Sequence, residues 1–391
     1  MSGTTFPRLF EPLTLGARTA PNRIVHAPMS VCYGHADGTV SRAEVEHYAR
    51  RAQGGAGTVI TENFAVSTAG RQMPLQTMVS GPEHVPGLRE IADAVHAHGA
   101  LAMVQLVHAG RYAGPWDVYE QQRRLAPSVV EFELTPGRVV TPAEITPAEI
   151  AESIAAFGRA AELCAEAGFD GVDVHGAQGF LLSSFLSPRT NRRTDGWGGD
   201  AHGRSRLLRE VVREVRRRTG PDFVVGVHLM SDELLPGGWT IGDAVALAPR
   251  LVADGADFLF AIPATFESLR VPPNVGLLGR HRYAMDDTRA LRAAVDVPVI
   301  ANGRLGDPAD AEAVLVRDEA AAVGLARPLF VDPDWPRKVA AGQADTVRSC
   351  PCDPPACLRT QLTGSVCDHW PPEVRARGHF GLAPVATGGM P

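Results

Sequence analysis

Lysine is almost absent from this sequence, in which Lys338 is the only one among 391 residues. Enzymes that form a Schiff base need a lysine amine, so Lys338 is the one side chain of this sequence that could support that chemistry. No apolar stretch reaches the roughly 18 residues of a membrane helix. The first residues also lack the charged and apolar regions of a secretory signal. We therefore expect no membrane partner and a reducing, cytoplasmic location.

Positive charge is not in excess either, because the net charge is -6 and the isoelectric point is about 6.1. Nucleic acids and anionic membrane surfaces bind strongly basic faces, so we expect neither as a partner. Hydrophobic residues make up 45% and charged residues 21% of the chain, as in ordinary globular proteins. The composition predicts a globular protein with a small-molecule substrate. It leaves the oligomeric state open, a homo-oligomer included.

Short apolar runs alternate with amphipathic stretches from about residue 22 to residue 330. Such alternation is typical of repeated βα units, and near-continuous apolar runs such as VVGVHL and PVIAN fit parallel strands buried on both faces. The strands are expected at residues 23–27, 58–62, 101–106, 171–175, 223–228, 257–261, 298–302 and 321–325. Eight such units predict an α/β fold, a closed (β/α)8 TIM barrel, rather than an open sheet.

The rest of the chain divides around this barrel. The clearest helix is expected at residues 147–167, where apolar side chains recur every three or four positions. No GxGxxG motif follows a strand, which argues against a dinucleotide-binding Rossmann fold. Residues 113–141 are expected to leave the barrel as an excursion, and residues from 371 onward to be irregular. We expect the barrel at residues 1–340 and a short cysteine-containing C-terminal extension at residues 341–391.

Polar side chains stand where several strands end, which is where such barrels place their active sites. Gln105 ends the third strand, and its amide offers a donor and an acceptor that match one edge of a flavin ring. His175 ends the fourth strand and is followed by Gln178. Two convergent N–H donors can polarise a carbonyl and stabilise the enolate that forms when hydride reaches the β-carbon. His175 and Gln178 are therefore the candidate catalytic residues, although structural roles also explain each residue taken alone.

The last two strands end in glycine and arginine. Asn302-Gly303-Arg304 follows the seventh strand, and Gly324-Leu325-Ala326-Arg327 ends the eighth. Glycines let backbone N–H groups approach a phosphate, and arginines can neutralise it. Barrels of this kind often bind phosphate after strands seven and eight. These turns predict a ligand that carries a phosphate.

The chain resembles the Old Yellow Enzyme superfamily, and most of all its branch containing 2,4-dienoyl-CoA reductase and trimethylamine dehydrogenase. The matching stretches follow in family order from about residue 9 to residue 338. They are LFEPLTLG…PNRIVHAPMS, QLVHAGRYA, AGFDGVDVHGAQGFLLSSFLSPRTNRRTDGWGG, PVIANGRLGDP and VGLARPLFVDP.

This resemblance implies FMN as the cofactor and implies that His175 and Gln178 hold the substrate above it. Asn63 would lie beside the O4 and N5 side of the flavin. His228 would face the N1–C2=O edge, where the family has an arginine, and only a protonated imidazole carries the same charge. The cofactor-binding residues expected in this way are Ala27, Pro28, Met29, Ser30, Asn63, Gln105, His228, Gly303, Arg304, Gly324, Ala326 and Arg327.

Two further positions depart from the family. Phe180 stands where a tyrosine usually gives a proton to the substrate, and Phe266 falls where the branch has a second acid, a histidine. Candidates for a replacement acid are Tyr33, Tyr112, His281 and Tyr283.

We therefore expect an FMN-dependent oxidoreductase that moves a hydride between flavin and an activated C–C or C–N bond of a small carbonyl-type substrate. Removal of hydride from the substrate, a desaturation, does not need the missing tyrosine and is one alternative. A catalytically impaired flavin or electron-transfer protein is another. A phosphate-binding lyase or aldolase without flavin is a third, but Lys338 lies outside the strand ends.

Four cysteines, Cys350, Cys352, Cys357 and Cys367, fall within 18 residues near the end of the chain. Such crowding in a reducing compartment favours metal binding over disulfides. Four thiolates suit a [4Fe–4S] cluster or zinc, and free thiols remain an alternative. The resembling branch carries a [4Fe–4S] cluster on a similar spacing just after its barrel, which favours the cluster. With a cluster, electrons would be exchanged with another protein; without one, NAD(P)H would reduce FMN directly.

Overall fold

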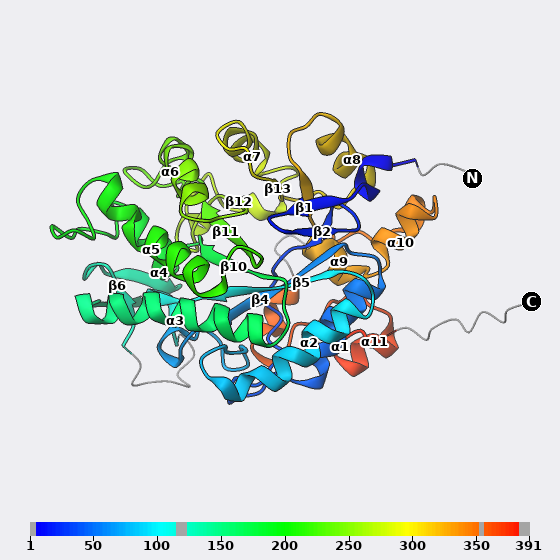
Figure 1. Ribbon diagram of the computed structural model, residues 1–391, viewed down its shortest axis with the longest axis horizontal. Coiled ribbons are helices and arrows are strands. Elements are labelled where there is room, and N and C mark those ends of the chain that lie inside the picture. Colours follow the sequence, from blue (N-terminus) through cyan, green and yellow to red (C-terminus); the bar gives the residue numbers. More distant parts are fainter. Residues whose placement is uncertain (1–4, 115–122, 352–355, 383–391) are drawn as a thin grey trace, which may run out of the picture.

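The barrel expected from the sequence is present. The computed structural model describes residues 5–114, 123–351 and 356–382. Eight parallel strands close into a barrel at the centre of the molecule, and helices surround it (Figure 1). In order around the barrel the strands are β3 (Ile24–His26), β4 (Thr58–Ala65), β5 (Leu101–Val107), β10 (Gly171–Gly176), β11 (Val224–Met230), β12 (Phe258–Ile262), β13 (Val299–Ala301) and β14 (Ala322–Gly324).

All eight strands lie where the apolar runs predicted them, with small differences at their ends. β4 continues to Ala65 and β11 to Met230, and every residue in both strands is buried. Burial on both faces explains why these strands lack a polar alternation: one side packs into the barrel and the other under the helices. The (β/α)8 prediction is therefore confirmed.

The outer layer consists of helices that follow the strands. They are α1 (Arg42–Gln53), α2 (Val85–His96), α3 (Pro147–Glu166), α5 (Ala201–Thr219), α6 (Ile241–Ala253), α7 (Met285–Arg292) and α8 (Pro308–Val316). α3 shows why the sequence folds this way. Thr146 and Glu149 form a capping box at its start, and Ile150, Phe157 and Cys164 are fully buried. Among the described residues no helix is long and apolar enough to cross a membrane.

One end of the barrel is covered by a hairpin that sequence patterns did not reveal. Strands β1 (Leu13–Leu15) and β2 (Arg18–Ala20) pair antiparallel. Leu13, Leu15 and Ala20 pack against the apolar side chains of the barrel interior, among them Met103 and Phe258. The hairpin precedes β3, so it closes the end at which the barrel strands begin. The hairpin does not cover the opposite end of the barrel, where the strands finish, and that end is available to a ligand.

Two segments outside the barrel contain structure that the sequence did not predict. The excursion after β5 contains a short hairpin of β7 (Phe132–Thr135) and β8 (Arg138–Val140). The tail from residue 371 was expected to be irregular, and this is wrong for its first part, because α11 (Pro372–Arg377) is a short helix. Its position is fixed by packing of the preceding Trp370 on Phe330, with ring centroids 4.6 Å apart.

Candidate active site

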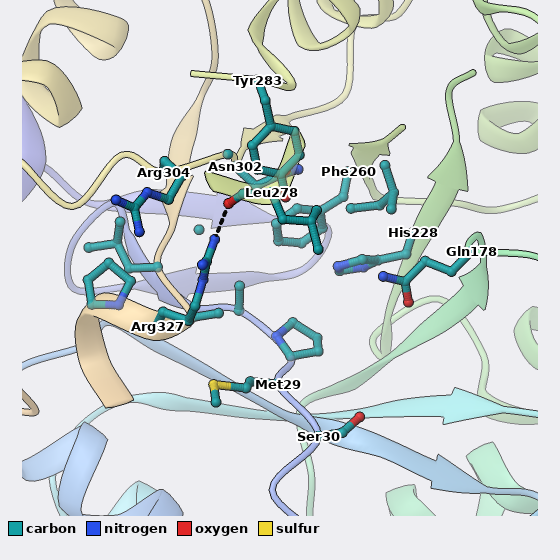
Figure 2. Close-up of a pocket in the computed structure, with 18 of the residues that line it drawn as sticks. Met29, Ser30, Gln178, His228, Phe260, Leu278, Tyr283, Asn302, Arg304 and Arg327 are labelled. Atoms are coloured by element: carbon teal, nitrogen blue, oxygen red, sulfur yellow. Dashed lines mark hydrogen bonds between the residues drawn. The ribbon is translucent and has the colours of Figure 1, made fainter. Parts of the chain in front are cut away.

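A cavity of about 530 Å³ opens where the barrel strands end (Figure 2). Its size is within the range of small-molecule and cofactor sites, roughly 300–1,000 Å³. The structure brings every residue predicted to bind cofactor or substrate to its wall. These residues are Ala27, Pro28, Met29, Ser30, Asn63, Gln105, His175, Gln178, His228, Gly303, Arg304, Gly324, Ala326 and Arg327. Their individual roles stay predictions.

The two turns with arginine form one side of this cavity. Gly303 has φ +100°, and a Cβ there would lie 2.9 Å from the backbone nitrogen of Ala284, so glycine alone fits. Arg327 donates from Nη2 to the carbonyl oxygen of Leu278 at 2.5 Å, as Figure 2 shows. Its other terminal nitrogen, Nη1, is buried without a partner. An unpartnered guanidinium N–H at the wall is what an anionic group such as a phosphate would satisfy.

Gln178 and His228 lie next to each other on the side of the cavity opposite these arginines (Figure 2). His175 also lines the cavity, with its ring centroid 6.0 Å from that of His228. The backbone N–H of Ala177 donates to Nδ1 of His175 at 3.3 Å, so the neutral ring carries its proton on Nε2. Burial above all, together with the coulombic effect of His228, lowers the pKa of His175 to about 3. His175 is therefore a neutral hydrogen-bond donor at neutral pH.

Gln178 has an unusual backbone. Its φ is +60°, a left-handed conformation that costs energy for any residue with a side chain. The strand-like bridge between Gln178 and Thr265 holds this conformation in place. Strain of this kind often occurs at functional sites, where it aims a side chain.

Aromatic rings surround this donor pair. The ring of Phe180 lies 4.9 Å from that of His175 and 5.5 Å from that of Phe266, measured between centroids. Apart from histidines, the charged side chains at the cavity wall are Arg304, Asp307 and Arg327, all in or beside the two turns. Within the described residues, the cavity wall around His175 and Gln178 therefore consists of neutral hydrogen-bond donors and apolar side chains.

None of the four candidate replacement acids stands beside the donor pair. Tyr33 is buried under the extension and donates to the carbonyl oxygen of Ser365 at 2.5 Å. Tyr112 is buried behind Phe180 and Phe266, and neither tyrosine is part of the cavity wall. Tyr283 does line the cavity, but it lies on the arginine side beside Asn302 (Figure 2).

His281 also lines the cavity, with its Nε2 2.6 Å from a carboxylate oxygen of Asp310. Burial raises the pKa of Tyr283, and of Tyr33 and Tyr112 as well. The described structure thus contains no evident successor to the tyrosine that Phe180 replaces.

The interior side of the cavity carries a buried acid. Oδ2 of Asp173 accepts a hydrogen bond from Nε2 of Gln105 at 2.7 Å and lies 2.6 Å from Nδ1 of His228. Asp173 is fully buried, and its Oδ1 has no partner. A carboxylate can only accept, so the Gln105 amide must turn its nitrogen to Asp173. Its oxygen is left for a ligand in the cavity.

The sequence matches the NADH:flavin oxidoreductase / NADH oxidase family over residues 8–346. The chain belongs to this family. It is 33% identical over 350 residues to an NADH oxidase from Thermoanaerobacter brockii, a match that covers 89% of this chain and 53% of that protein. The chain spans about half the length of the first curated relatives it matches.

Solved structures agree. A 2-naphthoyl-CoA reductase complex superposes with a TM-score of 0.83 at 26% identity, covering 88% of this chain and 53% of the other. An Old Yellow Enzyme homologue from Zymomonas mobilis gives 0.73 at 27% identity, covering 86% and 93%. The resemblance to the Old Yellow Enzyme superfamily is therefore confirmed.

In this member of the NADH:flavin oxidoreductase family the C-terminal extension forms part of the cavity wall, which the sequence did not reveal. Ser349, Cys350, Leu358 and Gln361 line the cavity. Gln361 donates from Nε2 to the carbonyl oxygen of Ser30 at 3.1 Å. No local pattern predicts this contact, because the two residues are more than 300 positions apart.

Three of the four clustered cysteines are described, and Cys352 lies outside the described residues. Cys357 and Cys367 are buried in one apolar cluster, with Cys350 packed against it. Burial above all, together with the neighbouring Cys350 and Cys367, raises the pKa of Cys357 to about 11. Within the described part of the chain no three His, Cys, Asp or Glu side chains are arranged to hold a metal ion.

Other wall residues were missed although a signal existed for one of them. Phe260 alternates with the interior Phe258 on β12, and a period of two predicts that it faces the barrel. Gln72 and Met73 come from a loop and Leu278 from the short 3-10 helix Leu277–Gly279, where no periodicity indicates direction. Sequence reasoning therefore found the strand-borne part of the site and missed most of the loop-borne part.

Proposed function

We propose that this chain is an FMN-dependent oxidoreductase that moves a hydride between flavin and an activated C–C or C–N bond of a small carbonyl-type compound. The observation that carries the proposal is one cavity with the arginine turns on one side and Gln178 and His228 on the other (Figure 2), and with His175 in the same wall. FMN has the matching shape, with a phosphate at one end and a redox-active ring at the other.

The residues present fit FMN. The unpartnered Nη1 of Arg327, with Arg304 and the Gly303 backbone, would hold the phosphate. The free oxygen of Gln105 would accept from the ring N3–H. When bound, the flavin supplies a site that accepts or gives two electrons as hydride.

The chain's own residues prepare the substrate. His175 donates from Nε2, and Gln178 from its amide, to one substrate oxygen. Both are neutral donors fixed before the substrate arrives, and such preorganised donors stabilise negative charge that develops on that oxygen. Phe180 and Phe266 form apolar aromatic surface next to the pair, and among the described residues the arginine and aspartate side chains of the wall lie at the two turns instead. The substrate we propose is therefore uncharged at this end and planar enough to lie between the rings and the cofactor.

The missing acid affects the α-proton that accompanies hydride transfer in either direction. Reduction of a C=C bond adds this proton and desaturation of a ketone removes it, and Phe180 can neither give nor take it. We propose that water replaces the tyrosine: it gives the α-proton slowly in reduction, and it accepts that proton when hydride leaves a saturated ketone, which we propose as the stronger activity. NAD(P)H, whose NADH form appears in the relative's name, is the proposed reductant at the same cavity.

Stopped-flow spectroscopy decides between the directions. Flavin-loaded protein is mixed with a cyclic saturated ketone, or is first reduced with NADH and mixed with the matching enone. Bleaching of the flavin by the ketone, faster than its reoxidation by the enone, supports the proposal. Rapid reoxidation by the enone with no bleaching by the ketone would show an ordinary ene reductase.

We also propose residues 1–340 as the FMN-binding barrel and residues 341–391 as an extension whose four cysteines bind a [4Fe–4S] cluster. The three described thiols gather in one apolar cluster, but they do not by themselves form a metal site. No step of the reaction is therefore assigned to a cluster. If one forms, an electron-transfer protein replaces NAD(P)H as the partner of the flavin.

A further inference from the structure

Asp173 lies one layer below the cavity, in the barrel interior. Its register partner on β5 is Gln105, and His175, two residues later on the same strand, is paired with His228 on β11. Side chains two residues apart on a strand face the same side. Asp173 therefore points inward beneath His175, and both of its close partners, Gln105 and His228, are cavity residues.

A buried carboxylate is costly unless a positive charge or several donors compensate it. Among the described residues the one basic side chain at ion-pair distance from Asp173 is His228, at 2.6 Å. The other groups packed against the His228 ring do not compete. Phe260 on β12, with ring centroids 4.1 Å apart, carries no charge. His175 on β10, 6.0 Å away, is kept neutral by burial.

We propose that Asp173 is a positioning residue that prepares Gln105 and His228 to bind and tune the flavin. This inference rests on the proposed function. Because the carboxylate accepts a hydrogen bond from Nε2 of Gln105, the amide oxygen of Gln105 points toward the cavity. The same carboxylate lies 2.6 Å from Nδ1 of His228, an ion-pair contact without hydrogen-bond geometry, and this leaves Nε2 of that ring for the cavity. With His228 neutral the pair presents two acceptors side by side, and a proton taken up by His228 turns its Nε2 into a donor.

The same arrangement compensates charge during flavin reduction. Reduction adds two electrons and one proton to the ring, which becomes negatively charged. A second proton, taken from solvent, goes to His228, where Asp173 stabilises the imidazolium. Two protons would then be taken up with two electrons, so that the net charge of the buried site would not change. Without Asp173 or a titratable residue 228, only the proton on the flavin is taken up.

The test measures FMN affinity by fluorescence quenching and the midpoint potential between pH 6 and 8. We expect Asp173→Asn to bind FMN about ten- to hundredfold more weakly, the usual effect of losing a charged hydrogen bond. In Asp173→Asn and in His228→Gln, the pH dependence of the midpoint potential should fall to about half of the wild-type slope. Asp170→Asn is the matched control, and we expect it to behave as wild type.

Asp170 is three residues earlier in the chain and contacts His96 and the backbone of Ala102, away from the cavity.

A double-mutant cycle adds a measurement that would not change if Asp173 had only a structural role. In the His228→Arg variant residue 228 is charged whether or not Asp173 is present. Asp173→Asn should therefore lower the flavin midpoint potential of the wild type, and should lower that of the His228→Arg variant much less. If Asp173→Asn does not fold, the pH dependence of the midpoint potential in His228→Gln and His228→Arg still tests whether His228 takes up the second proton.

Two results would overturn the inference while leaving the proposed function intact. One is a His228→Gln variant whose midpoint potential depends on pH as in the wild type. The other is an equal change of midpoint potential on Asp173→Asn in the wild type and in His228→Arg. A wild-type protein that binds no flavin would overturn both. The two failures are distinguished at the first measurement, which is made on the wild type.

Discussion

Arg304 donates a hydrogen bond of 2.9 Å from Nη1 to the carbonyl oxygen of Cys350. This contact joins the turn after β13, at the side of the cavity proposed for phosphate, to the first of the clustered cysteines. Gln361 makes a second contact of this kind to the backbone of Ser30. The cofactor side of the site is therefore built jointly by the barrel and its extension, and changes in either should alter flavin binding.

Replacing Arg327 should weaken FMN binding more than any other single loss of charge. Nη1 of this residue is buried without a partner, so a bound phosphate would gain a charge-assisted hydrogen bond there. We expect Arg327→Gln to raise the FMN dissociation constant about ten- to hundredfold, measured by calorimetry. Arg317→Gln removes the same charge from an exposed site and should bind as wild type. Equal affinity of both variants would place the phosphate elsewhere.

A tyrosine at position 180 should restore a proton donor. The Phe180 ring lies beside His175 at the cavity wall, so a hydroxyl there would reach the substrate side. General acids contribute about 10²–10⁴-fold to rates, and we expect Phe180→Tyr to speed enone reduction at least tenfold. Single-turnover reoxidation of reduced flavin measures the effect. Phe132→Tyr, which packs on Tyr112 outside the wall, serves as control; a similar rate in both variants would contradict the account.

Acid should destabilise the protein through His108. Burial lowers its pKa to about 4 from 6.5, so the unfolded chain binds more protons than the folded one between these values. Stability therefore falls as the pH drops through this window. Between pH 7 and pH 5 the loss due to His108 is about 2 kcal/mol. His108→Asn keeps an acceptor for the backbone N–H of Gly110 without this titration.

Urea unfolding at the two pH values tests this. Wild type should lose about 2 kcal/mol more than His108→Asn, and the difference between the two proteins removes contributions from other groups. Equal losses would mean that His108 takes up no proton on unfolding.

Loss of one clustered cysteine should change the metal content. If the four cysteines hold a [4Fe–4S] cluster, Cys357→Ser purified without air loses the broad iron–sulfur absorption and most of its iron. Cys164→Ala removes a buried thiol of α3, far from the extension in sequence, and should keep both. Iron analysis and the dithionite difference spectrum provide the readout. Zinc in the wild type, or no metal at all, would refute the cluster.

The sequence could predict the barrel because each strand carries its own signal, an apolar run between turn residues. It could predict Gln105, His175 and Arg327 because strand ends meet at one mouth of a barrel. It could not predict that Gln361 would contact Ser30, since that contact depends on how the extension folds over the barrel. Nor could it predict α11, whose position depends on packing of Trp370 on Phe330.

The pair of Asp173 and His228 lies between these cases. Their strands and their inward direction follow from the period of two, but the 2.6 Å separation depends on the register between β10 and β11. A sequence does not specify that register until the barrel closes. His228 was accordingly predicted as a cofactor residue, whereas the role of Asp173 was not.

The most direct test of the account is a flavin titration. Apoprotein, purified without air, is titrated with FMN while the flavin fluorescence and the visible spectrum are recorded. The account predicts saturable binding of one FMN per chain, with quenched fluorescence and a shifted visible band, and much weaker binding of riboflavin, which lacks the phosphate. A protein that stays colourless and leaves the fluorescence of added FMN unchanged would contradict it.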